Sequence, residues 1–133
     1  MSENPAKRIT FSLLRVVAGL LFLQIGGMKI FDWFGGVPVQ HGGHPAFLSQ
    51  IWIGGALEFF GGALILLGFL TRPAAFILAG EMAVAYFQFH QPSGFWPVQN
   101  HGESAVLFCF IFLFFAAHGA GAWSIDALRG RKA

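Results

Sequence analysis

Residues 51–70 read IWIGGALEFFGGALILLGFL and decide the fold class, because this apolar run has the length that crosses a bilayer. A helix needs about 20 mostly apolar residues to span a hydrocarbon core of about 30 Å. The run carries one charge, Glu58, between the glycine pairs at 54–55 and 61–62. Similar runs lie outward from it along the chain, at residues 9–31, 73–90 and 103–121. We therefore expect an all-α, integral membrane four-helix bundle that forms one domain over residues 1–133.

The composition supports a protein that lives in a lipid bilayer. Hydrophobic residues make up 56% of the 133-residue chain and charged residues 11%, whereas soluble domains carry about 45–50% apolar and about 25% charged residues. The net charge of +2 provides no basic surface for nucleic acid. A single Cys excludes an intramolecular disulfide framework. The lipid bilayer is the partner that these numbers imply, and nucleic acid is not.

The positively charged residues outside the spans predict the orientation of the chain, because cytoplasmic loops are enriched in Lys and Arg. With an even number of spans, these residues all fall on one side: Lys7, Arg8, Arg72, Arg129, Arg131 and Lys132. Residues 32–50 and 91–102, which connect the spans on the other side, contain no Lys or Arg. We expect a multi-pass protein with both termini in the cytoplasm.

Each span carries one polar or small-residue stripe, which we expect to face the interior because ionisable groups are costly in lipid. In the first span the stripe contains Arg15, Gly19, Phe22, Gly26 and Lys29. In the second, Glu58 and the flanking glycines share a face that permits close helix contact. The expected stripes of the third and fourth spans are Ile77, Glu81, Ala85 and Gln88, and Glu103, Leu107, Phe110, Phe114 and His118.

Depth along the spans suggests which charged groups meet. At about 1.5 Å per residue, Arg15 and Glu81 come to nearly the same level, so we expect them to form a structural ion pair. Lys29 and Glu103 both lie near the outer boundary and are expected to approach each other. For Glu58, either Lys29 bends down to it or burial keeps its carboxyl group protonated. Glu58 is equally open to a structural hydrogen bond and to a role in a site.

Histidines gather on the side of the chain that lacks Lys and Arg. His41, His44, His90 and His101, with Glu103, have the donor types that bind Zn, Cu or Fe. Hydrogen bonding of these histidines to the loop backbone is the more favoured interpretation, and a site for a quinone head group is a further one. Haem ligation by His90 and His101 is the least favoured alternative.

Several sequence motifs lie along the chain's spans and their borders. The first span reads R-x-x-x-G-x-x-F-x-x-x-G-x-x-K from Arg15 to Lys29. The second offers G-x-x-E-x-x-G-G from Gly55 and then G-F-x-T-R-x-A-A from Gly68, and residues 100–103 read N-H-G-E. Taken together, these motifs resemble those of the DoxX family of small bacterial four-span membrane proteins, whose N-G-G-E has a glycine where this chain has His101.

The resemblance implies a bacterial inner-membrane protein of a redox system, because some relatives are linked to thiosulfate:quinone oxidation and others to membrane oxidoreductase complexes. We expect a subunit or accessory with a small-molecule site formed by Lys29, Glu58, His90 and Glu103. Quinone is the cofactor left open, and metal or haem is less favoured. Another membrane or periplasmic redox protein is the expected partner. A structural assembly partner of another membrane enzyme and a small transporter are the alternatives, and the oligomeric state and enzymatic activity stay open.

Overall fold

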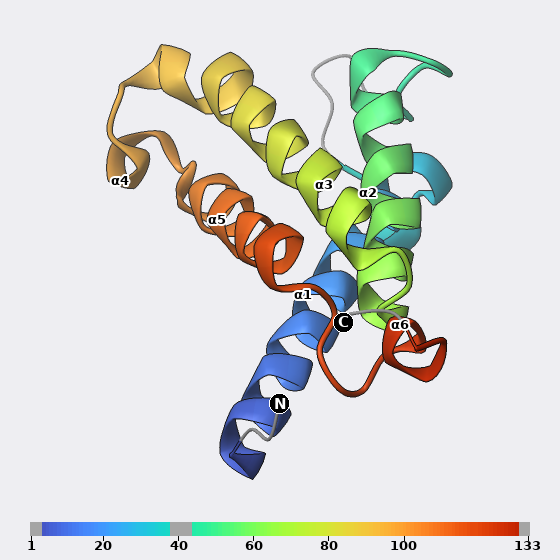
Figure 1. The fold of residues 1–133 in the computed structure, drawn as a ribbon. Helices are drawn as coiled ribbons and strands as arrows, with labels where there is room; N and C mark the ends of the chain where they lie inside the picture. The colour runs from blue at the N-terminus through green and yellow to red at the C-terminus, as the bar shows by residue number, and fades with distance from the viewer. Residues whose placement is uncertain (1–3, 38–43, 131–133) are drawn as a thin grey trace.

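The chain folds into helices over the residues that the computed structural model describes, 4–37 and 44–130, and no strand occurs within these ranges (Figure 1). The long helices are α1 (Pro5–Phe31), α2 (Gln50–Leu67), α3 (Thr71–Ala85) and α5 (Glu103–His118). Short helical segments connect or follow them: η1 (Trp33–Gly35), η2 (Tyr86–His90), η3 (Gln91–Ser93), α4 (Pro97–Asn100) and α6 (Ile125–Leu128). The predicted all-α class is confirmed.

Local signals set the ends of the helices close to the expected spans. The side chain of Asn4 caps α1, which begins at Pro5, earlier than expected. α2 ends at Leu67 because Gly68 adopts a left-handed conformation with φ 68°, which commonly terminates a helix. Pro73 lies in the first turn of α3, where its missing N–H leaves no helical hydrogen bond unmade.

α1 and α2 pack backbone to backbone through glycines on both helices. A Cβ added at Gly19 would lie 2.4 Å from the backbone nitrogen of Leu66, and one at Gly26 would lie 2.2 Å from that of Phe59. A Cβ at Gly62 would approach the backbone nitrogen of α1 residue Leu23 to 2.6 Å. No side chain fits at these positions, so the small residues allow the close approach. The glycine faces predicted for the first two spans are confirmed.

The stripes predicted for the third and fourth spans are wrong in large part. Ile77 is 54% exposed on α3, while Leu107 and Phe110 on α5 are each 64% exposed. The buried faces are instead formed by Thr71, Ala74, Ala75, Leu78, Ala79 and Met82 on α3, and by Ala105, Phe112 and Phe115 on α5. α5 is apolar on all sides except at its ends, where the polar residues Glu103, Ser104 and His118 lie. Polar groups at helix ends reach the interface and do not mark the buried face.

Phenylalanine rings fill the space between α1 and α5. The ring of Phe22 on α1 lies 4.7 Å, centroid to centroid, from the rings of both Phe108 and Phe112 on α5. Nearer the start of α1, the rings of Phe11 and Phe115 lie 5.7 Å apart. Edge-to-face contacts of this kind join the α1–α2 pair to the α3–α5 pair.

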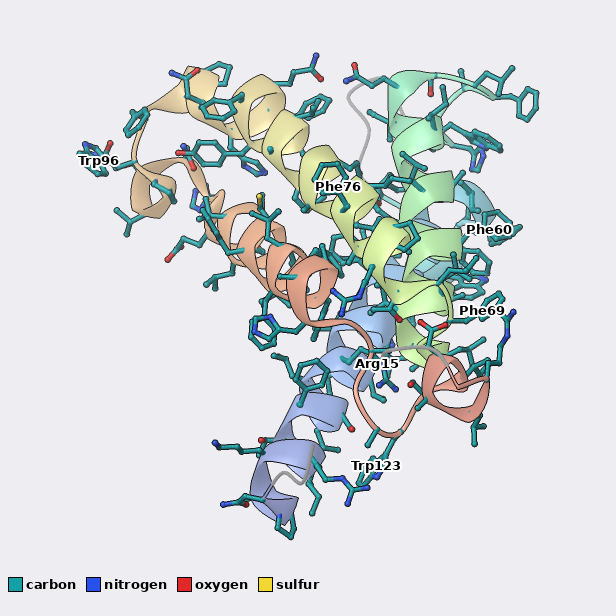
Figure 2. The ribbon with its side chains drawn as sticks, in the orientation of Figure 1. Arg15, Phe60, Phe69, Phe76, Trp96 and Trp123 are labelled. Atoms are coloured by element: carbon teal, nitrogen blue, oxygen red, sulfur yellow. The ribbon has the colours of Figure 1, made fainter. Side chains whose placement is uncertain are left out.

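The outer surface of the bundle is apolar, as a lipid-facing surface must be. Helices α1 and α2 are long and apolar enough to cross a membrane, and α5 is a shorter apolar helix. Phe60 on α2 and Phe76 on α3, labelled in Figure 2, are 60% and 65% exposed. Exposed apolar area of this extent is stabilised by lipid and not by water.

Candidate functional site

The candidate site begins where Lys29, in the last turn of α1, crosses α2 at Gly55. A Cβ at position 55 would lie 2.5 Å from the Cβ of Lys29 and 3.4 Å from its Cδ. Any side chain at position 55 would therefore occupy the path of the lysine. Because this residue is glycine, the aliphatic part of Lys29 runs along α2 and carries its ammonium group toward Glu58.

Lys29 and Glu58 form a largely buried ion pair. The Nζ of Lys29 lies 2.8 Å from Oε1 and 3.1 Å from Oε2 of Glu58. Glu58 is 1% exposed, whereas the Lys29 side chain keeps 23% of its surface accessible. Of the two alternatives for Glu58, the structure shows the one in which Lys29 bends toward it. The expected approach of Lys29 to Glu103 is therefore wrong, because Glu103 is exposed at the start of α5.

The carboxyl group of Glu81, from α3, joins this ion pair. It lies close enough to interact with the carboxyl group of Glu58 and with the charge of Lys29. Its Oε2 is also 3.2 Å from the position of a Cβ at Gly54, so the glycine leaves room for it. Three helices thus bring two carboxyl groups and one ammonium group together. One ammonium balances one carboxylate, so the second carboxyl group needs a proton or a further cation.

The expected Arg15–Glu81 pair is wrong, because the chain after α5 supplies other partners to Arg15. Arg15 is 1% exposed, and its Nε donates a hydrogen bond of 3.0 Å to the carbonyl oxygen of Ile65. Its two terminal nitrogens donate to the carbonyl oxygens of Ala120 and Trp123. Figure 2 shows Arg15 and Trp123 at the same end of the bundle. The depth argument compared charged side chains only, so it did not consider backbone carbonyl oxygens as partners for Arg15.

The C-terminal segment also brings a buried carboxylate to Arg15. Asp126, in α6, is 6% exposed and interacts with the charge of Arg15. Its carboxylate accepts hydrogen bonds from the backbone N–H groups of Leu70 at 3.1 Å and Thr71 at 3.2 Å. Asp126 thereby satisfies the N-terminus of α3 as well as balancing the arginine. Its polar partners are all groups of the protein itself.

Lys29 and Glu58 line a cavity of about 360 Å³, which lies between α1, α2, α3 and α5. Its walls are mostly apolar and include Phe22, Ile25, Met82, Ala105 and Phe108. His90, at the end of η2, lines it as well. Three of the four predicted ligand-binding residues therefore meet at one cavity. The fourth, Glu103, does not line it, and the neighbouring Ser104 does.

The orientation of His90 is set by a network around Asn100. The Nδ1 of His90 lies 3.1 Å from the carbonyl oxygen of Asn100. Because a carbonyl oxygen can only accept, Nδ1 carries the proton and a neutral His90 keeps Nε2 as an acceptor. The Asn100 side chain, in turn, donates to the hydroxyl of Tyr86 at 3.1 Å and to the carbonyl of Gly94 at 2.6 Å, and its oxygen accepts from the Gly102 N–H at 2.8 Å.

The remaining histidines do not form a metal site within the residues that the structure describes. No group of three or more potential ligands occurs there. His44 contacts Asp32 instead, with Nδ1 2.7 Å from Oδ1. His101 is exposed and adopts φ 60°, the left-handed conformation for which glycine is favoured. His41 lies outside the described residues, so its part in a metal cluster stays a prediction, as does haem ligation.

Three residues of these clusters were missed by sequence reasoning, namely Tyr86, Asn100 and Asp126. Asn100 belongs to the N-H-G-E motif, but the motif does not show that its amide holds a turn together. Asp126 follows Ser124, whose hydroxyl accepts a hydrogen bond from the Ala127 N–H at 3.0 Å. A serine followed by an acidic residue is typical of a helix start, and this signal for α6 was available in the sequence.

Comparison with known proteins identifies relatives over most of the chain. The family model described as DoxX matches residues 10–91. An uncharacterized protein of Haemophilus influenzae is 38% identical over 120 residues, which cover 86% of this chain and 87% of the relative. The inner membrane protein YqjF of Escherichia coli is 34% identical over 127 residues, covering 89% of this chain and 90% of that protein.

A more distant relative covers nearly the whole chain. The uncharacterized membrane protein Rv3486 of Mycobacterium tuberculosis is 31% identical over 146 aligned positions, covering 99% of this chain and 86% of that protein. No solved structure matches the chain. The matched region of the family model, residues 10–91, contains Arg15, Lys29, Glu58, Glu81 and His90.

Proposed function

The chain belongs to the DoxX family of membrane proteins, and from this premise we propose that it binds a quinone in the cavity lined by Lys29, Glu58 and His90. It acts as a multi-pass inner-membrane subunit or accessory of a redox system, and a partner protein supplies the electrons. The observation that carries this proposal is the convergence of a buried ion pair and an oriented histidine on one apolar cavity.

The size of the cavity suits a single substituted ring. Ligand pockets in proteins range from about 300 to 1,000 Å³, and an engineered apolar cavity of about 150 Å³ binds benzene. The cavity here measures about 360 Å³. A quinone ring enters such a space without large rearrangement, while its apolar tail extends into the surrounding lipid.

The polar groups match the chemistry of a quinone in both oxidation states. The ammonium group of Lys29 donates a hydrogen bond to a quinone carbonyl oxygen, and the Nε2 of His90 accepts one from a quinol hydroxyl. Glu58 holds Lys29 in place through both carboxylate oxygens, and Glu81 adds a second carboxyl group. Reduction of a quinone to a quinol takes up two protons with two electrons, so carboxyl groups beside the ring supply an acid–base function.

The distribution of positive charges supports an orientation with both termini in the cytoplasm. Apart from Arg15 and Lys29, the Lys and Arg residues lie in the first turn of α1, in the first turn of α3 (Arg72) and in the sequence after α6. The cavity then lies toward the periplasmic side, within reach of a membrane or periplasmic redox partner. The single cysteine of the chain does not form a dithiol pair, which supports a role in quinone binding over one in thiol exchange.

Binding of decylubiquinone to the detergent-purified protein tests this proposal, together with quantification of co-purified quinone by mass spectrometry. Glu58→Gln removes the partner of Lys29 and is expected to weaken binding at least roughly ten-fold, as expected for loss of a charged hydrogen-bond partner. Glu103→Gln is the matched control, because it removes an exposed carboxylate outside the cavity, and it leaves binding unchanged. Far-UV circular dichroism of each variant verifies that the helices are intact.

Other outcomes would replace the proposal. No bound quinone and no response to decylubiquinone, with co-purification of another membrane enzyme, would favour a structural assembly partner. Proton flux into proteoliposomes that requires Glu58 and Glu81 would favour a small transporter. Equal binding by wild type and Glu58→Gln would place the quinone elsewhere in the molecule.

A further inference from the structure

A second cavity lies at the other end of the bundle, which we call the α6 end. Its volume is about 850 Å³, and it lies where the first turns of α1 meet the last turn of α5 and the segment leading into α6. Figure 1 shows the N-terminal turns of α1 projecting past the end of α5 beside this segment. The quinone proposal does not involve this cavity.

Two cations line the cavity without a carboxylate partner among the described residues. Lys7 and Arg8 lie near the start of α1, whose first turn contains no acidic residue. The ion pairs that the described ranges contain, Lys29–Glu58 and Asp32–His44, belong to the opposite end of the bundle. The N-terminus of a helix also carries the positive end of the helix dipole, which disfavours cations and favours a bound anion.

Asp126, a carboxylate that the structure describes at this end, has its polar partners within the protein. It is 6% exposed and accepts hydrogen bonds from the N–H groups of Leu70 and Thr71. It also balances the buried Arg15. Within residues 4–37 and 44–130, no carboxylate forms an ion pair with Lys7 or Arg8, so both are open to an anion from outside the chain.

One part of the lining of the same cavity, further along α1 and on α5, forms an apolar wall. Phe11, Leu14 and Phe114 line it, and Leu14 and Phe114 are 42% and 39% exposed. His118 lies at this wall with its ring stacked on Phe114 at 4.1 Å between centroids. A free inorganic anion would use the cations and leave this apolar surface unused. A molecule with an anionic group and an acyl chain would use both.

We propose that this cavity binds an acidic phospholipid, with its phosphate at Lys7 and Arg8 and an acyl chain along Phe11, Leu14 and Phe114. The location fits, because the start of a membrane-spanning helix lies at the level of lipid head groups. Basic pockets between spanning helices are known binding places for anionic head groups. Occupation by lipid also neutralises charge that otherwise opposes the dipole of α1.

Native mass spectrometry of the full chain, released from nanodiscs of phosphatidylglycerol and phosphatidylcholine with identical acyl chains, tests the proposal. We expect retention of phosphatidylglycerol in preference to phosphatidylcholine. Each cation near an anionic lipid contributes about a five-fold gain in binding, so the double variant Lys7→Gln/Arg8→Gln should bind roughly 30-fold more weakly. Both residues are exposed, so the helices should form normally in this variant.

Arg129→Gln is the matched control, because Arg129 is an exposed cation at the same end that lies 5.0 Å above the ring of Phe69, outside the cavity. It should retain phosphatidylglycerol as the wild type does. Equal retention by the double variant would overturn the proposal, as would equal retention of the two lipids. Displacement of the lipid by millimolar glycerol 3-phosphate would instead identify a site for free phosphate and would also overturn it.

Discussion

The two buried charged clusters of this bundle lie on one face of α1 and differ in how fully their polar groups are satisfied. Arg15 donates to three backbone carbonyl oxygens and is balanced by Asp126. About 21 Å along the helix, by its rise of about 1.5 Å per residue, Lys29 faces both Glu58 and Glu81 and borders a cavity. The first cluster is saturated by the protein, whereas the second has capacity left for a ligand or a proton.

This difference separates a structural role from a binding role for residues of the same kind. A buried charge that is fully hydrogen-bonded to the backbone fixes the chain around it, and its loss leaves several acceptors unpaired. A buried charge beside open space can exchange partners without unfolding the helices. The sequence presents Arg15 and Lys29 as equivalent members of one stripe, and only their surroundings distinguish them.

The largest expected effect on the free energy of unfolding comes from replacing Arg15, whose cluster is fully satisfied by groups of the protein. Arg15→Met leaves three carbonyl oxygens without their donor and the buried Asp126 without its balancing charge, so the free energy of unfolding should fall by about 3–5 kcal/mol. Denaturant or thermal unfolding in detergent measures the change. Arg129→Gln, an exposed arginine at the same end, should change it by less than about 0.5 kcal/mol. Wild-type stability in Arg15→Met would remove the distinction drawn between the clusters.

A bulkier residue in the α1–α2 contact should disturb both the stability of the bundle and the Lys29 cluster. Gly26→Ala places a Cβ 2.2 Å from the backbone nitrogen of Phe59, so the helices must separate at a cost of about 1–3 kcal/mol. Decylubiquinone binding should weaken as well, because Lys29 lies one turn away. The control is Gly80→Ala, where a Cβ meets nothing within 4 Å. Equal stability of the two variants would contradict backbone contact between α1 and α2.

Replacing both members of the Lys29–Glu58 ion pair should abolish quinone binding without lowering the stability of the protein. The double variant Lys29→Met/Glu58→Leu removes both charges, and such replacements of buried pairs are neutral or stabilising by about 1–4 kcal/mol. Decylubiquinone binding should nevertheless be lost. The single variant Lys29→Met keeps two buried carboxyl groups without a cation and should be less stable than the double variant. Retained binding in the double variant would disprove the proposed role of the pair.

The smallest effect is expected at Glu103, which the sequence placed with the site and the structure places outside it. Glu103→Gln alters an exposed residue, so its free energy of unfolding should stay within about 0.5 kcal/mol of wild type. Binding of decylubiquinone, measured in the same titration, should also be unchanged. A clear loss of binding would return Glu103 to the site and would indicate that the cavity extends to the start of α5.

How much of the site was predictable depended on where each polar residue lies. Lys29 and Glu58 were predictable because charges within a span must face inward and because glycines mark the buried faces of their helices. Glu103 was misleading because a carboxylate at a helix end can point to solvent. The buried face of α5 could not be predicted, because a helix that is apolar on all sides shows no periodic alternation of apolar and polar residues.

The sequence by itself determined the membrane environment, the helical class, the approximate spans and the glycine faces of α1 and α2. Each of these follows from local composition and spacing, which act within one helix or between neighbouring ones. Only the tertiary structure decided which charges meet. Arg15 finds its acceptors more than 100 residues away at Ala120 and Trp123, and Lys29 reaches Glu58 because position 55 has no side chain. Such pairings depend on how distant segments of the chain pack against each other. The spacing of residues within one helix carries no information about that packing.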